Sequence, residues 1–331
     1  MEYSDRLQAL RGSIAHMKTA YITHADCLRH EMGAGHPECP DRLNAVNAEM
    51  RSSGMLDELR CLEAPLARAE DLKRVHRAAY VDAIFENAPS EGYVQLDPDT
   101  AMNPYSLAAA QRAAGAGVMA VDELMAQRSD NAFCAIRPCG HHATQVRSMG
   151  FCIFNNIGVA AAYALEKKGL ERVAVIDFDV HHGNGTEDMF SPPHWHKRVL
   201  MTSFFQHPFY PYSGTANPAP NMINIPLAAG SGGAAAKKAV ETHWLPALEN
   251  FKPQMIFISA GFDAHKEDLL GGMALLEADY AWMTRELKQV AARHSQGRIV
   301  SMLEGGYNLS ALGRSAVAHV RALSEASPGQ V

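Results

Sequence analysis

Four polar residues crowd the end of an apolar run in VAVIDFDVHHGNGT, residues 173–186. They are Asp177, Asp179, His181 and His182. Carboxylates and imidazoles are the side chains that bind zinc and similar divalent cations. Burying such carboxylates without a partner would cost several kcal/mol for each ion, so a bound cation is the expected compensation. The stretch therefore predicts a metal site where a buried strand ends.

Three other segments place similar residues directly after apolar runs. They are RPCGHHA (137–143), AGFDAH (260–265) and EGGYN (304–308), which supply His141, His142, Asp263 and Tyr307. Each segment alone is ordinary, because a histidine pair is more often a polar loop and a strand-terminal aspartate more often caps a helix. Their occurrence together favours one shared site over four unrelated loops.

The elements that must position these residues alternate along the chain. We expect strands at 19–24, 132–138, 172–180, 198–205, 254–261 and 298–305, and helices at 106–127, 155–169, 232–251 and 277–294. This alternation predicts a three-layer α/β/α fold with a central, mostly parallel sheet. Ligands of such sheets lie beyond the carboxyl ends of the strands, where all four segments fall. If the strand at 172–180 stays extended, Asp177 and Asp179 share one of its faces.

Composition limits the classes of function. The chain has 331 residues, of which 47% are hydrophobic and 20% charged, and its formal net charge is −6. A chain of this length can bury a large core, and its net negative charge offers no basic face for nucleic acid. No apolar run approaches the roughly 20 residues of a membrane span, and the N-terminus lacks the apolar segment of a signal peptide. We therefore expect a cytoplasmic protein that binds neither nucleic acid nor membrane.

Cysteine spacing indicates the redox state of the thiols, and the absence of linkers indicates the number of domains. The six cysteines include no C-x-x-C pair, which fits reduced thiols better than a disulfide framework or a structural zinc site. No linker, low-complexity stretch or repeat interrupts the alternation, so we expect a single domain over residues 17–325. Residues 1–16 are expected to form an N-terminal extension.

The motifs also carry a resemblance. The chain resembles the histone deacetylase family, which comprises zinc-dependent amidohydrolases of the arginase/deacetylase fold, and most of all its class II and bacterial branch. The matching blocks are GHPECPDRL (35–43), RPCGHHA (137–143), MGFCIFNN (149–156), DFDVHHGNGT (177–186), SAGFDAH (259–265) and EGGYN (304–308). Asn184, where class I members carry aspartate, favours that branch. Cys139 departs from the pattern, because it replaces the usual second proline of RPPGHH.

The resemblance implies which residues bind ions. It assigns one catalytic zinc ion to Asp179, His181 and Asp263, and three protein ligands leave a position open for water and substrate. It also implies one or two monovalent cations, K⁺ or Na⁺, near Asp177 and Ser203.

The resemblance further implies the catalytic pairs. His141 pairs with Asp177, and His142 pairs with Asn184. A carboxylate partner raises the pKa of His141, whereas the neutral Asn184 leaves His142 able to exchange a proton near neutral pH. We therefore expect His142 to act as general base and then acid, with His141 as its electrostatic partner. Tyr307 is expected to polarise the acyl carbonyl together with zinc.

Substrate contacts follow from the same resemblance. Gly150, Phe151 and Tyr210 are expected along a narrow channel, with Asp99 at its rim. Core packing is the alternative for the two aromatic residues, and a turn is the alternative for Asp99. Aligning DLLGG (268–272) with the family's DPLGG places Leu270 at the mouth, where polyamine-selective relatives of the class IIb type have glutamate.

These features leave several functions open. Hydrolysis of acyl-lysine in proteins or peptides is the first, and Leu270 favours it, although Glu267 and Asp268 are carboxylates close to the mouth. The same chemistry on acetylpolyamines or another small amide is the second. A non-catalytic metal-bound interaction module and a binuclear manganese ureohydrolase are weaker alternatives. Association into a homo-oligomer is left open.

Overall fold

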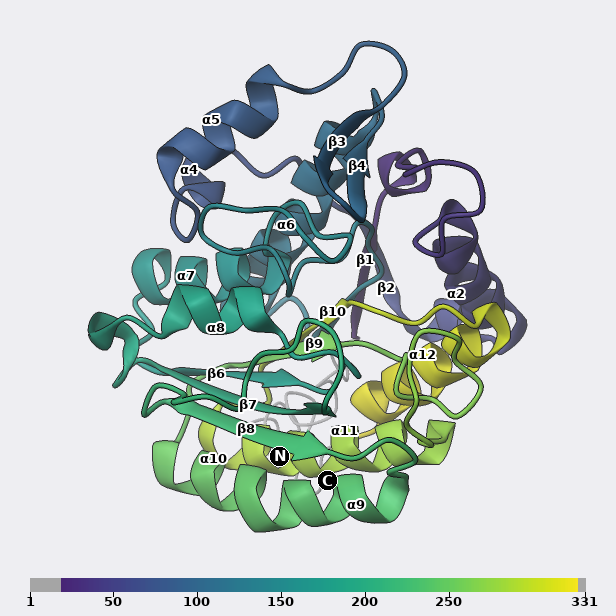
Figure 1. The fold of residues 1–331 in the computed structure, drawn as a ribbon. Helices are drawn as coiled ribbons and strands as arrows, with labels where there is room; N and C mark the ends of the chain where they lie inside the picture. The colour runs from purple at the N-terminus through teal and green to yellow at the C-terminus, as the bar shows by residue number, and fades with distance from the viewer. Residues whose placement is uncertain (1–18, 327–331) are drawn as a thin grey trace, which may run out of the picture.

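A computed structural model describes residues 19–326 and centres on one parallel sheet (Figure 1). The predicted extension at 1–16 lies outside the described residues. The strand order is β2-β1-β5-β10-β9-β6-β7-β8, and every pairing in this sheet is parallel. The strands are β1 (Ala20–Thr23), β2 (Arg60–Glu63), β5 (Ala132–Cys134), β6 (Val173–Asp177), β7 (Val199–Gln206), β8 (Met222–Leu227), β9 (Ile256–Ala260) and β10 (Ile299–Leu303). Strands β3 (Val94–Asp97) and β4 (Thr100–Met102) form a separate antiparallel hairpin.

Helices cover both faces of the sheet, which confirms the predicted three-layer fold. They are η1 (Ala25–Leu28), α2 (Pro40–Ser52), α3 (Met55–Glu58), α4 (Ala69–Leu72), α5 (Ala78–Glu86), α6 (Ser106–Met125), α7 (Asn156–Lys167), α8 (Asn184–Phe190), η2 (Pro193–Trp195), α9 (Gly233–Ala239), the π-helical η3 (Val240–Trp244), α10 (Leu245–Phe251), α11 (Glu277–His294) and α12 (Leu309–Ser324). In Figure 1, α7 and α8 lie over one face, whereas α9, α10 and α11 lie over the other. Near one edge, α2 from the start of the chain packs against α12 from its end.

Central strands form where the sequence is continuously apolar. Every residue of β6, β9 and β10 is buried, as expected for parallel strands covered on both faces. The edge strands β2 and β8 were not predicted, because their residues are only partly buried and lack such a run. Pro226 lies within β8, and proline is tolerated in a sheet mainly at its edge.

Three predicted elements differ clearly from those observed. The strand expected over 132–138 ends at Cys134. The helix expected over 232–251 is divided by a π-helical turn just before Pro246. Proline lacks an N–H group and its ring clashes with the preceding turn, which accounts for the wider turn there. The strand expected over 172–180 ends at Asp177, so Asp177 and Asp179 do not share a strand face. Instead, the Asp179 backbone N–H donates to Asp177 Oδ1 at 3.1 Å.

A buried ion network fixes the loop before α2 to the segment that follows β5. Arg137 Nε donates to Glu38 Oε1 at 2.6 Å and Nη2 donates to Oε2 at 2.7 Å, while Nη1 donates to the Cys27 carbonyl at 2.6 Å. Arg42 Nη1 donates to Glu38 Oε1 at 3.1 Å. Burial opposes ionisation of Glu38, but Arg137, followed by His30 and Arg42, outweighs it and lowers its pKa to about 2. The stability from Glu38 is therefore present above its ordinary pKa of 4.5 and is lost as the pH falls toward 2.

No helix in residues 19–326 is long and apolar enough to cross a membrane.

Removing Arg137 should destabilise the protein strongly, because it leaves Glu38 buried without its two-point partner. We expect Arg137→Ala to lower the free energy of unfolding by about 3–5 kcal/mol in urea titrations. Arg137→Lys keeps the charge without the planar two-point contact. Its free energy of unfolding should lie between those of the parent and Arg137→Ala. The control Glu241→Gln removes an exposed ion pair with Lys237 and should change stability by at most about 0.5 kcal/mol. A loss below about 1 kcal/mol for Arg137→Ala would contradict this role of the network.

Candidate active site

The polar segments singled out in the sequence meet at one edge of the sheet. Strands β5, β10, β9 and β6 are consecutive neighbours and run parallel, so their carboxyl ends point the same way. Segments from all four strand ends thus supply polar side chains to the same region. This is the position where open parallel sheets bind ligands.

Asp179, His181 and Asp263 form a three-donor cluster. Each offers a ligand atom, and these atoms lie within 4.8 Å of one another. His181 Nδ1 lies 3.0 Å from Asp179 Oδ1 and 3.1 Å from Asp263 Oδ2. Both carboxylates are fully buried, whereas the imidazole is 12% exposed. Two carboxylates and one imidazole with one accessible side fit a divalent cation that keeps an open coordination position.

The electrostatics of this cluster favour positive charge. Burial opposes protonation of His181, but its hydrogen bonds with Asp179 and Asp263 outweigh burial and raise its pKa to about 10. Burial and the nearby Asp179 charge raise the pKa of Asp263 to about 7. Burial disfavours the charged form of Asp179, yet His141 and His181 lower the pKa of Asp179 well below its usual range. The two carboxylates therefore stabilise a cation or a proton between them.

Backbone groups hold the two carboxylates in place. Gly305 N–H donates to Asp179 Oδ2 at 2.9 Å, and Val180 N–H donates to Asp263 Oδ1 at 2.8 Å. A Cβ atom on Gly305 would lie 2.0 Å from Asp263 Oδ2 and 2.7 Å from Asp179 Oδ2. Gly305 is therefore required for the close approach of this backbone to both carboxylates.

Two histidines lie beside the cluster, each with its own partner. His141 Nδ1 is 2.9 Å from Asp177 Oδ2, and His142 Nδ1 is 2.7 Å from Asn184 Oδ1. The centroids of the two imidazole rings are 4.0 Å apart. Burial disfavours the charged form of both, but Asp179 and Asp177 raise the pKa of His141 well above its ordinary value. Burial and the His141 charge lower the pKa of His142, so a neutral base lies next to a cationic neighbour.

A cavity of about 300 Å³ opens above these groups. Its lining comprises Asp99, His142, Gly150, Phe151, His181, Phe209, Tyr210, Leu269, Leu270 and Tyr307. All five substrate-contact residues proposed from the sequence are among them, so Phe151 and Tyr210 lie on the cavity wall. Asp99 lies in the turn between β3 and β4 and lines the cavity as well.

Two residues of the cavity were missed by the sequence analysis. The Phe209 ring stacks on His181 with centroids 5.3 Å apart and an interplanar angle of 17°. Leu269 is 81% exposed at the mouth. Only their position in the chain could have identified them, since they directly precede Tyr210 and Leu270.

Tyr307 is held by two side chains whose contacts with it were not predicted. The Arg42 guanidinium lies 4.8 Å from the centre of the Tyr307 ring, and Arg42 Nε donates to the Gly306 carbonyl at 2.6 Å. The Tyr307 N–H donates to Asp268 Oδ2 at 2.6 Å. Burial raises the pKa of Tyr307 well above its ordinary value, so its hydroxyl keeps its proton at neutral pH.

The two acidic residues considered near the mouth point elsewhere. Asp268 is nearly buried and also accepts from the backbone N–H groups of Asn308 and Leu270. Glu267 forms an ion pair with Arg314 at 3.0 Å. Neither lines the cavity, so Leu270 faces it without a carboxylate from this loop.

Known proteins are similar to this chain in both sequence and fold. A profile described as the histone deacetylase domain matches residues 36–323. The histone deacetylase-like amidohydrolase of Pseudomonas aeruginosa is 37% identical over 315 residues, covering 88% of this chain and 82% of that protein. Histone deacetylase 14, chloroplastic, of Arabidopsis thaliana is 34% identical over 310 residues, covering 87% of this chain and 73% of that protein. The crystal structure of the HDA15 HD domain aligns with a TM-score of 0.86 at 34% identity, over 95% of this chain and 90% of that chain.

The contact between Gly305 and the two carboxylates leads to a test of metal binding. We expect the parent to bind one divalent cation, with Zn²⁺ as the probe, and Asp179→Asn to lose it. Gly305→Ala should weaken binding by about 10- to 100-fold, because its methyl group displaces both carboxylates. Gly232→Ala is the control, since a Cβ atom there would first meet the Ala274 carbonyl oxygen, at 3.1 Å, and not a carboxylate of the cluster. Elemental analysis and zinc titration measure the effect, and equal affinity in Gly305→Ala and the parent would refute it.

Proposed function

The chain belongs to the histone deacetylase family, and from this we propose that it is a zinc-dependent deacetylase that removes acyl groups from lysine side chains of proteins or peptides. The observation that carries the proposal is the cluster of Asp179, His181 and Asp263, whose His181 lines a cavity of about 300 Å³. His142 and Tyr307 line the same cavity. This combination supplies a cation site, a base and a hydroxyl donor to one small volume.

Asp179, His181 and Asp263 would hold the zinc ion. Their nitrogen and oxygen donors suit zinc, and three protein ligands are the usual number at a catalytic site. When bound, zinc would act as a Lewis acid and would lower the pKa of a coordinated water. Two carboxylate ligands neutralise its charge, which makes a neighbouring base more useful.

The chain's own residues then perform the proton transfers. Neutral His142 accepts the proton of the attacking water and later donates it to the leaving amine. Cationic His141, fixed by Asp177, favours the negative charge that develops beside it. The Tyr307 hydroxyl donates a hydrogen bond to the acyl oxygen. Apolar walls such as Phe151 exclude water from the lysine stem and orient the amide.

Further assignments belong to the same proposal. Asp177 and Ser203 are both buried and lie opposite each other in β6 and β7, which supports a structural K⁺ or Na⁺ ion near them. We assign residues 17–325 to one catalytic domain. A cytoplasmic location stays a prediction, and association into a homo-oligomer stays open.

Loss of the Tyr307 hydroxyl tests the mechanism. We expect Tyr307→Phe to lower kcat for an acetyl-lysine peptide by about a hundredfold or more, because one oxyanion donor is worth about 2.7–4 kcal/mol. Its zinc content, measured in the same sample, should not change. Tyr212→Phe is the matched control, since Tyr212 is 75% exposed and does not line the cavity, and it should keep parental activity. Near-parental turnover by Tyr307→Phe would exclude the proposed role.

Leu270 leads to a prediction about substrate. Its apolar side chain suits a lysine stem and offers nothing to the second ammonium of a polyamine. We expect kcat/KM of the parent to favour acetyl-lysine peptides over acetylspermidine. Leu270→Glu should shift this ratio toward acetylspermidine by about tenfold, whereas Leu270→Gln, which adds no charge, should not. A parent that already prefers acetylspermidine tenfold would instead support the acetylpolyamine alternative.

A further inference from the structure

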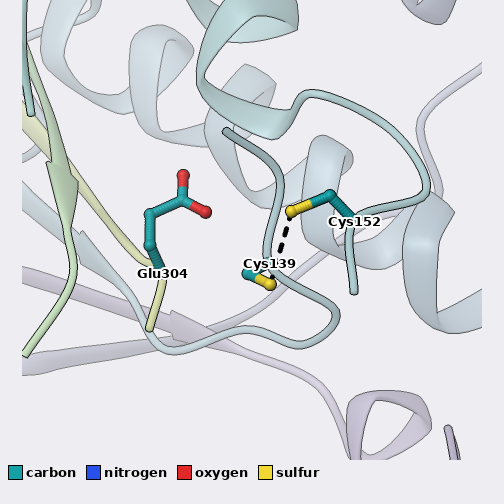
Figure 2. A group of neighbouring side chains, drawn as sticks. All are labelled: Cys139, Cys152 and Glu304. Carbon is teal, nitrogen blue, oxygen red and sulfur yellow. Dashed lines mark hydrogen bonds between the residues drawn. The ribbon is translucent and has the colours of Figure 1, made fainter. Parts of the chain in front are cut away.

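Two thiols lie in contact directly behind the cavity wall. The sulfur atoms of Cys139 and Cys152 are 3.4 Å apart, and the dashed line in Figure 2 marks the hydrogen bond between them. Both side chains are buried, and Cys152 Sγ also lies 3.3 Å from the Gly150 carbonyl oxygen. With Ala143 they form a small apolar cluster, separate from the main core, against which Phe151 packs.

The segment between these cysteines carries much of the active site. Residues 140–151 include His141 and His142, and they also include Gly150 and Phe151 of the cavity wall. The two sulfurs therefore meet where this segment begins and ends. A change in their separation would act on the base of the cavity and on its wall together.

Glu304 lies beside the two sulfurs but is already engaged. Its Oε2 accepts from the backbone N–H groups of Gly140 at 2.7 Å and His141 at 3.1 Å, and its Oε1 accepts from Ser259 Oγ at 3.1 Å. A metal bound to Glu304 and the thiols would compete with these hydrogen bonds. Chemistry between the two sulfurs alone leaves them in place.

We propose that Cys139 and Cys152 form a site of oxidative modification, at which a peroxide joins the two thiols in a disulfide and reversibly lowers enzymatic activity. The chemistry at sulfur is independent of the substrate, whereas the effect on activity rests on the proposed function. The pairing is particular to a chain with a cysteine at position 139.

The reaction balances with hydrogen peroxide as the oxidant. The Cys139 thiolate attacks one peroxide oxygen, the O–O bond breaks, and hydroxide leaves as water after taking up the thiol proton. Cys152 Sγ then attacks the sulfenic sulfur of Cys139, which forms the S–S bond and releases a second water with the Cys152 proton. Two thiols and one peroxide thus give one disulfide and two waters.

Burial of the thiols bears on the rate of oxidation, and the distance between the sulfurs bears on its effect on activity. Burial raises the pKa of Cys152, so little of it is thiolate at neutral pH and its attack on the sulfenic sulfur should be slow. A disulfide brings the sulfurs from 3.4 Å to about 2.05 Å. Displacements of about 1 Å near reacting groups can lower rates by about a hundredfold. We expect a loss of at least tenfold in kcat.

The test maps the bond in the parent and measures activity in the same samples. The zinc-loaded protein is treated with excess hydrogen peroxide, quenched with catalase, alkylated and digested with trypsin without reduction. Cleavage after Arg128, Arg147 and Lys167 should give peptide 129–147 linked to peptide 148–167. Fragmentation between Cys134 and Cys139 assigns the sulfur. Activity should fall at least tenfold and should return with dithiothreitol.

Variants and outcomes separate this proposal from the proposed function. Cys152→Ser should keep its activity through the same treatment, whereas Cys61→Ser, altered at an exposed cysteine, should respond as the parent does. Absence of the linked peptide would overturn the modification site. A linked peptide without loss of activity, or equal loss in Cys152→Ser, would overturn the effect on catalysis. If the untreated parent hydrolyses no acyl substrate, the proposed function fails, while the peptide map still decides whether the disulfide forms.

Discussion

Three aspartate carboxylates are fully buried at one edge of the sheet, and the rest of the site depends on how their charge is balanced. Asp177 is balanced by His141, and Asp179 and Asp263 converge on His181. Uncompensated burial of such charges would be strongly unfavourable, so positive charge must be located among them. Burial lowers the pKa of His142, and the positive charge that the carboxylates hold on the neighbouring His141 lowers it further. A neutral base next to a cationic neighbour is thus a consequence of carboxylate burial.

The central part of this arrangement could be predicted from the sequence, because it depends on local patterns. Strands covered on both faces are continuous apolar runs, and parallel strands bring their carboxyl ends to one edge. These two rules locate Asp177, Asp263 and Tyr307 without coordinates. Edge strands such as β8 do not follow the first rule, because their residues are only partly buried. The strand expected over 172–180 ends at Asp177, so the condition under which Asp177 and Asp179 would share a face is not met.

What could not be predicted is the set of contacts between distant segments. Arg42 donates to the Gly306 carbonyl across 264 positions, and no periodicity marks such a pair. Asp268 looked like a residue of the mouth because it lies close to Leu270, yet its carboxylate accepts from the Tyr307 N–H. Side-chain direction at a loop depends on the hydrogen bonds available there, and those come from other loops.

Leu269 gives the mouth of the cavity a distinct thermodynamic character. Its side chain is 81% exposed, and Leu270 beside it adds to the apolar lining. Covering these two side chains releases water from apolar surface, so a ligand that rests on them should bind with a negative heat-capacity change. That part of the binding free energy gains little enthalpy near room temperature and weakens on cooling. Screening by salt does not weaken it, in contrast to attraction between charges.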